Sequence, residues 1–197
     1  CMSDKDKNRE LEAGAIALSG QLGKTIQRLR KAYNLSLSEL SEQSGVAKMT
    51  LYRYFPSKDD LIVAYLEDSN AKFWVWFDEA ISGEGLNGRE RLLALFGALQ
   101  KLVSNPLCYG CPFLNAATEF PEPAHPGHGV AMEHKRLLLK RLSELAEAAG
   151  AIQPEALAQQ LLTLMDGAFM QVRMFGVDNP AQTVAQAAAA LIDCQIH

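Results

Sequence analysis

The side chains best suited to redox or metal chemistry gather in a proline-rich stretch, residues 105–129. Cys108 and Cys111 are separated by two residues, a spacing found in redox pairs and in half of a structural zinc site. The second cysteine pair that such a zinc site needs does not occur in the sequence. We therefore interpret these thiols as small side chains that line a pocket, with a thiol sensor as the alternative.

Imidazole and carboxylate groups follow closely, at Glu119, His125, His128 and His134. Such groups can hold a divalent metal, but their spacing matches no compact metal motif, so we expect neither a metal nor another cofactor. They could also supply the nucleophile and base of an enzyme, which is the rival class of function. Because the sequence has no nucleophile elbow, phosphate loop or zinc-protease motif, we do not expect an enzyme.

A different pattern, from Leu37 to Pro56, fits a helix-turn-helix. Leu40 and Leu51 stand where the two helices must pack together, and Gly45 falls where the turn needs a positive φ. Ser36 is a suitable N-cap for the first of these helices. The pattern predicts two short helices joined by a tight turn, the second of which can enter a major groove of DNA.

The second helix, about residues 47–53, carries side chains that suit contact with DNA. Lys48 can donate to guanine, Met49 can touch a thymine methyl group, Thr50 can bond a base or a phosphate, and Tyr52 can reach the backbone. The alternative is an ordinary helical hairpin with a solvated face.

Charge is distributed unevenly along the chain. The whole sequence carries a net charge of −4, yet residues 20–58 hold seven basic and two acidic side chains, a net +5 that leaves −9 for the remainder. A basic segment within an acidic protein favours binding to nucleic acid by that segment.

The run from Gly45 to Leu61, GVAKMTLYRYFPSKDDL, resembles the signature of the tetracycline-repressor (TetR) family. That signature is a Thr-Leu-Tyr-x-His/Tyr-Phe recognition helix followed directly by x-Ser/Asn-Lys-x-x-Leu. The resemblance implies an all-helical homodimer with an N-terminal DNA-binding module and a C-terminal ligand domain. It also implies contacts with bases or grooves from Lys48, Met49, Thr50 and Tyr52, and with phosphates from Tyr54 and Lys58.

Residues 20–35 depart from this family pattern and read more like the opening of a Cro-like phage repressor. A Cro-like regulator with a fused helical domain is therefore the nearer alternative. Further along, Gly110 to Phe120 is similar to a subset of TetR-family members with a Gly-Cys-x-Phe-x-Asn-Ala/Leu pattern. The function implied is a ligand-responsive repressor that acts as a homodimer on a palindromic operator.

Helical periodicity runs through nearly the whole chain, which predicts an all-α fold of about nine helices. We expect a three-helix DNA-binding domain at residues 8–56 and a helical ligand-binding and dimerisation domain at 57–197. After the helix-turn-helix, helices are expected at about 57–81, 89–104, 113–119, 130–149 and 154–175, with a last one from Asn179-Pro180 onward. No membrane span and no secretory leader is apparent, so a cytoplasmic location is expected.

Bulky apolar side chains in the C-terminal part are candidates for an effector site that takes an apolar or aromatic small molecule, although plain core packing explains most of them individually. The candidates are Trp74, Phe77, Phe96, Cys108, Cys111, Phe113, Met165 and Phe169, with Asn115, Glu119 and His134 as polar anchors. The last two helices are rich in small residues, which allows close helix approach across a two-fold axis or within one chain.

Overall fold

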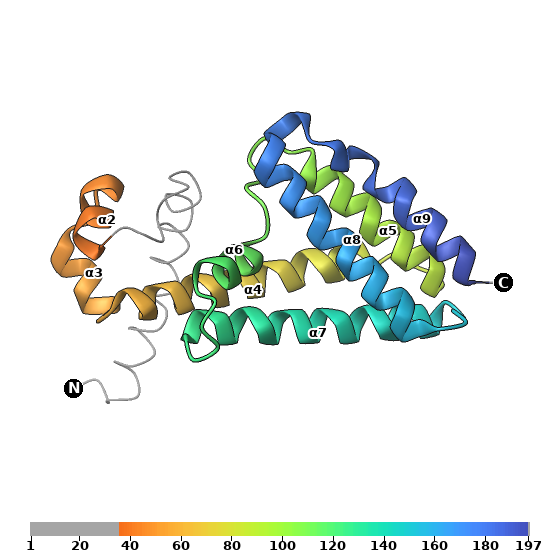
Figure 1. Cartoon of the computed structure of the whole chain (residues 1–197), viewed down its shortest axis with the longest axis horizontal. Coiled ribbons are helices and arrows are strands. Elements are labelled where there is room, and N and C mark those ends of the chain that lie inside the picture. Colours follow the sequence, from red (N-terminus) through yellow and green to blue (C-terminus); the bar gives the residue numbers. More distant parts are fainter. Residues whose placement is uncertain (1–35, 197) are drawn as a thin grey trace. The chain divides into compact units, whose positions relative to one another are not determined.

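The computed structural model describes residues 36–196 of the chain (Figure 1). This range contains eight α-helices and two short 3-10 helices, and its only extended pairing is an isolated bridge between Ala151 and Ile196. The all-α expectation is confirmed. The expected first helix and the Cro-like stretch 20–35 lie outside the described residues, so the total of about nine helices stays a prediction. Within residues 36–196, no helix is long and apolar enough to cross a lipid bilayer.

The chain divides into two compact units, which are described separately. Unit 1 comprises Cys1–Lys72 and Ala116–Ala131, and unit 2 comprises Phe73–Asn115 and Met132–His197. Three helices contribute residues to both: α4 (Lys58–Ala80), α6 (Pro112–Glu119) and α7 (Pro126–Ala148). The domain boundary expected after residue 56 stays a prediction.

Unit 1 begins, in its described part, with α2 (Leu37–Ser44) and α3 (Lys48–Tyr54). Ser36 caps α2 as expected: its hydroxyl accepts from the Glu39 amide at 3.2 Å, and the Glu39 carboxylate accepts from the Ser36 amide at 2.7 Å. Gly45 ends α2 with φ 71°, a conformation that costs other residues free energy. Both sequence-based expectations for this helix are confirmed.

A small apolar core holds α3 and the start of α4 together. Leu51, Phe55 and Leu61 are at most 2% exposed, and Val46 and Tyr54 pack against them. The expected capping box of α4 is present, because the Ser57 hydroxyl accepts from the Asp60 amide at 3.1 Å while Asp60 accepts from the Ser57 amide and hydroxyl.

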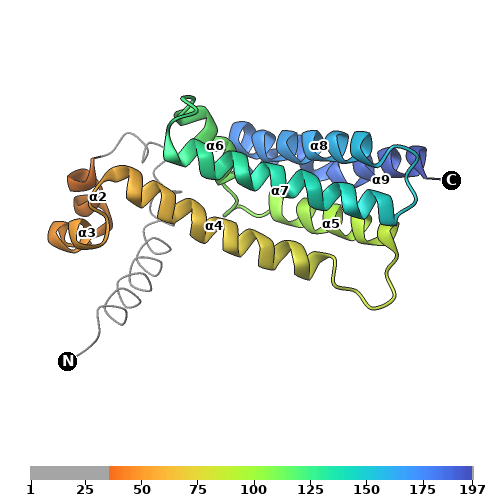
Figure 2. The same ribbon diagram turned by 90° about the horizontal axis from the view of Figure 1, so that it is seen from below.

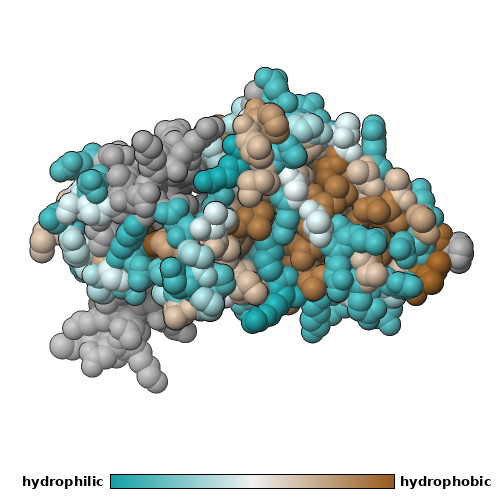
Figure 3. Space-filling model, viewed as in Figure 1, coloured by the Kyte–Doolittle hydropathy of each residue, from teal (hydrophilic) through white to brown (hydrophobic). Residues whose placement is uncertain are grey.

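Unit 2 is built around α5 (Gly88–Val103), α8 (Pro154–Phe175) and α9 (Val184–Gln195), which lie side by side in both views (Figures 1 and 2). Their core positions are fully buried, among them Leu92, Leu95, Leu99, Leu161 and Ile192. The 3-10 helices Gly176–Asp178 and Pro180–Thr183 connect α8 to α9. Apolar surface remains over the region of α8 (Figure 3), where Met170, Met174 and Phe175 are exposed.

Two helix starts differ from the sequence-based expectation. α7 begins at Pro126 rather than near residue 130, since proline suits the first helical turn and the following glycines do not interrupt it. The last α-helix begins at Val184, because the residues from Pro180 first form a 3-10 turn. Asn179 is buried there, and its amide donates to the Val103 carbonyl at 3.0 Å.

Candidate nucleic-acid interface

The two sides of α3 have opposite environments. Leu51 faces the core of unit 1 with no exposed surface, whereas Met49 is 80% and Tyr52 43% exposed. Lys48 and Thr50 are also exposed. The outward side of α3 therefore presents an ammonium group, a thioether, a hydroxyl and a phenol, which match the donors, acceptors and thymine methyl of a major groove.

The turn before α3 is held by side-chain bonds. The Ser41 hydroxyl donates to the Val46 carbonyl at 2.6 Å, and the Ser44 hydroxyl accepts from the Val46 amide at 3.3 Å. Together with the left-handed Gly45, these bonds fix the direction in which α3 leaves the turn. A rigid turn lowers the entropy cost of placing α3 in a groove.

Aromatic rings organise the basic side chains of α3. The Lys48 ammonium lies 5.8 Å from the centre of the Tyr52 ring, and the Arg53 guanidinium lies 5.7 Å from that of Tyr54. Such cation–π contacts limit the freedom of long side chains. Tyr54 differs from the predicted contacts with bases or grooves, which are exposed, because it is partly buried against the apolar core of unit 1.

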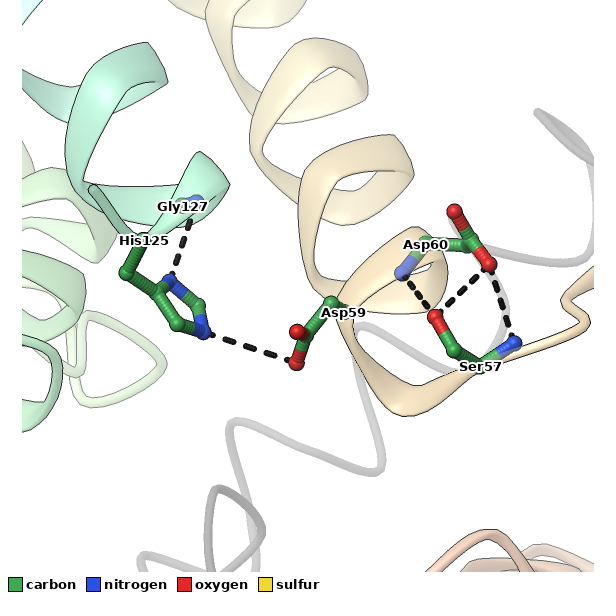
Figure 4. A network of polar contacts seen from close by, with 5 residues as sticks. All are labelled: Ser57, Asp59, Asp60, His125 and Gly127. Atoms are coloured by element: carbon green, nitrogen blue, oxygen red, sulfur yellow. Dashed lines mark hydrogen bonds and ion pairs between the residues drawn. The ribbon is translucent and has the colours of Figure 1, made fainter.

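Lys58 is the first residue of α4 and is partly exposed. Bonds from Ser36 lower the pKa of the Glu39 carboxyl, and the positive charge of Lys58 adds to this lowering, which indicates that Lys58 lies within electrostatic range of α2. Asp59 and Asp60 follow it (Figure 4), so the helix start carries both signs of charge.

The predicted effector residues of unit 2 partly come together around His134. This imidazole is buried and stacks on Phe113 with ring centres 3.6 Å apart and an angle of 11° between the planes. Trp74 lies 5.8 Å from it and Phe73 4.7 Å, both measured between ring centres. Sequence reasoning missed Phe73, whose only signal was its place one helical turn before Phe77.

Burial, together with a smaller contribution from the positive charge of neighbouring Lys135, lowers the pKa of His134 to about 3. The imidazole is therefore neutral near pH 7. A neutral ring can donate or accept a hydrogen bond but offers no charge to a ligand.

The remaining candidates are spread through the two units. Phe77, Phe96 and Met165 have no exposed surface, and Phe169 is 6% exposed, as expected for core packing. Asn115 accepts a bond from Arg173 at 2.6 Å between Oδ1 and Nη1. Glu119 is exposed and belongs to unit 1.

The thiols of Cys108 and Cys111 are free, and burial raises the pKa of both. For Cys111 the positive charge of Lys135 works against that rise. Since the thiolate is the reactive form, burial disfavours reaction at these cysteines. No group of three potential metal ligands is found among the residues that the structure describes, His125, His128 and His134 included.

An open groove of about 250 Å³ lies elsewhere in unit 2, between α7 and α8. It is lined by Arg136, Leu139, Lys140, Ser143, Glu155 and Gln159. None of these residues was a sequence-based candidate, because they are ordinary surface positions of two long helices.

The chain matches two family descriptions in succession. Residues 30–65 match "Bacterial regulatory proteins, tetR family", and residues 88–188 match "Tetracyclin repressor-like, C-terminal domain". It is 27% identical over 134 residues to the HTH-type transcriptional regulator YjdC of Escherichia coli K12, which covers 68% of this chain and 70% of that protein.

Solved structures of TetR-family regulators are also similar to this chain. A TetR-family regulator from Streptomyces coelicolor has a TM-score of 0.78 and 26% identity, covering 93% of this chain and 95% of its own. A putative TetR regulator from Streptomyces avermitilis has a TM-score of 0.76 and 28% identity, covering 95% of this chain and 99% of its own.

A helix-turn-helix module joined to a helical C-terminal part defines a DNA-binding regulator of transcription, not an enzyme. The chain belongs to the TetR family, as the Gly45–Leu61 signature predicted.

Proposed function

We propose that this regulator is a ligand-responsive repressor that binds a near-palindromic operator as a homodimer. The observation that carries the proposal is the division of α3, where Leu51 holds the fold while Met49 and Tyr52 stand exposed on the same short helix. Met49 and Tyr52 are one helical turn apart, so together with Lys48 they form a mixed apolar, aromatic and basic surface that suits contact with a major groove.

In this proposal, α3 enters the major groove, and its side chains contact different parts of the DNA. Lys48, Met49, Thr50 and Tyr52 contact bases or the groove, while Tyr54 and Lys58 contact phosphates. The partial burial of Tyr54 supports a phosphate contact rather than base reading, because a side chain anchored in the core reaches less far. Such a protein acts where the chromosome lies, so we propose a cytoplasmic location.

The apolar surface of α8 supports the homodimer. Met170, Met174 and Phe175 are 39%, 69% and 56% exposed, and α9 adds small residues such as Ala187 and Ala190. A two-fold axis through this surface would bury the apolar groups of both copies against each other. Two recognition helices would then read half-sites about one DNA turn, roughly 34 Å, apart.

The rings around His134 support an effector that is planar, mostly apolar and uncharged. The proposed lining is the part of the predicted set that lies in unit 2, namely Trp74, Phe77, Phe96, Cys108, Cys111, Phe113, Asn115, His134, Met165 and Phe169; Glu119 belongs to unit 1 and stays a sequence-based candidate only. Because the Phe113–His134 stack leaves no room between the two rings, the effector would have to separate them or bind along their edges. It would change DNA binding only by favouring one conformation of the dimer over another.

The test is a selection of duplexes from a random-sequence library by the wild-type chain, followed by binding titrations. We expect near-palindromic duplexes and a protein that sediments as a dimer. Lys58→Ala should weaken binding, whereas Lys101→Ala, an exposed lysine of α5, should not. Equal affinity of the wild type and Lys58→Ala would remove the phosphate contact from the proposal, and failure to enrich any duplex would remove DNA reading altogether.

A further inference from the structure

We propose that His125 is a positioning residue for DNA binding, which holds the first turn of α4 through Asp59 and so fixes Lys58 at the DNA backbone. The inference rests on the proposed function, in which Lys58 contacts phosphate. All three residues belong to unit 1. His125 lies in the proline-rich turn, far from α4 in sequence, and no part of the helix-turn-helix pattern includes it.

The two ring nitrogens of His125 contact different helices (Figure 4). Nδ1 accepts from the Gly127 amide at 3.1 Å, so the imidazole caps the N-terminus of α7. Because Nδ1 accepts, the ring N–H is on Nε2, which lies 3.4 Å from Oδ1 of Asp59. One side chain therefore links the starts of α7 and α4.

The orientation of this ring is determined by its surroundings. It stacks on Phe120 with ring centres 4.0 Å apart and 6° between the planes, and its side chain is only 17% exposed. The chain beside it is close to α4 as well, since a Cβ added at Gly127 would meet Cγ2 of Ile62 at 3.1 Å. The contact with Asp59 is thus made by a fixed ring, unlike most surface pairs.

The two acidic residues in the first turn of α4 have different tasks. Asp60 completes the capping box with Ser57, while Asp59 is turned to His125 (Figure 4). Consecutive residues of a helix point in different directions, so Asp59 held by His125 is kept away from the side on which Lys58 would meet a phosphate. Released from His125, this half-exposed carboxylate would compete for the Lys58 ammonium and repel the phosphate.

Two substitutions at His125 separate its two contacts. His125→Asn keeps an acceptor for the Gly127 amide, because asparagine is a favoured N-cap, but its side chain is too short to reach Asp59. His125→Gln places an amide N–H about as far out as Nε2 and can restore the contact with Asp59. His128→Gln is the matched control, since His128 lies three residues further on, in the first turn of α7, and its Nδ1 lies 2.9 Å from the Phe120 carbonyl oxygen instead.

The experiment measures affinity for a duplex selected by the wild-type chain at several salt concentrations. One phosphate contact accounts for about a 3.5-fold change in affinity over a fourfold change in salt. We expect His125→Asn to lose the salt dependence of one phosphate contact, as Lys58→Ala does. The variant that carries both substitutions should lose no more than either single variant. His125→Gln should recover this salt dependence, and His128→Gln should match the wild type.

The outcomes separate this inference from the proposed function. A normal salt dependence in His125→Asn, with a reduced one in Lys58→Ala, overturns the inference alone. A normal salt dependence in Lys58→Ala overturns the phosphate contact and the inference together. Weaker binding of His125→Asn with a lower melting temperature and an unchanged salt dependence assigns His125 a structural role only, which also overturns the inference.

Discussion

Leu51 and Met49 stand two residues apart on α3, and their replacement by alanine should separate folding from DNA binding. Leu51 has no exposed surface and packs in one apolar cluster with the buried Phe55 and Leu61. Truncating a buried leucine removes its transfer free energy and leaves a cavity, at a cost of about 2–5 kcal/mol.

Met49 is 80% exposed, so its truncation removes little buried surface and should change stability by less than about 0.5 kcal/mol. We expect Leu51→Ala to speed amide hydrogen exchange across α2 and α3 by a factor that corresponds to its loss in stability, and to abolish DNA binding. Met49→Ala should keep the wild-type exchange rates and bind DNA more weakly.

The assay is hydrogen exchange read by mass spectrometry on peptides that cover residues 36–55, beside a duplex-binding titration. The reasoning is refuted if Met49→Ala speeds exchange as much as Leu51→Ala, because Met49 would then be a core residue. It is also refuted if Leu51→Ala binds DNA normally, because the core of unit 1 would then not position α3.

Three further predictions concern unit 2. Gly88→Ala should lower the free energy of unfolding by about 1–3 kcal/mol in denaturant titrations, because the added Cβ would lie 2.3 Å from the Ala149 nitrogen. The control is Gly97→Ala, which should be neutral or stabilising because a Cβ there meets nothing within 4 Å. Equal effects of the two substitutions would contradict the close approach at Gly88. His134 binds its proton more weakly in the folded than in the unfolded protein. The free energy of unfolding should therefore fall as the pH drops below about 6.5, by roughly 2.5 kcal/mol between pH 7 and 4.5. His134→Phe should lack that part of the pH dependence, and a pH profile parallel to that of the wild type would contradict the prediction. A maleimide should label exposed Cys194 well before Cys108 and Cys111, as read by peptide mass spectrometry, and rapid labelling of Cys111 would instead favour the thiol-sensor alternative.

Local rules explain what the sequence predicted well. The capping boxes at Ser36 and Ser57 and the left-handed Gly45 depend on residues within three or four positions of one another, and the structure confirms each of them. The buried place of Leu51 follows from the same short-range pattern. The DNA-binding module was predictable because its signature is contiguous.

The surroundings of His134 could not be predicted from the sequence, because they depend on contacts between helices that are distant in the chain. Phe73, Phe113 and His134 come from α4, α6 and α7, and only the packing of unit 2 brings their rings together. The same holds for His125, which the sequence offered only as a possible metal ligand. Its contact with Asp59 joins residues 66 positions apart, and the early start of α7 at Pro126 is what brings its ring to a helix N-terminus.

The most direct test of the central claim, that α3 reads DNA sequence, is a second duplex selection with Lys48→Ala. If Lys48 donates to a guanine, the variant should lose the preference at one position of each half-site, a change of about 1–3 kcal/mol, while the other positions keep theirs. Selection of the same sequences with the same preference at every position would contradict the claim that Lys48 on α3 reads bases.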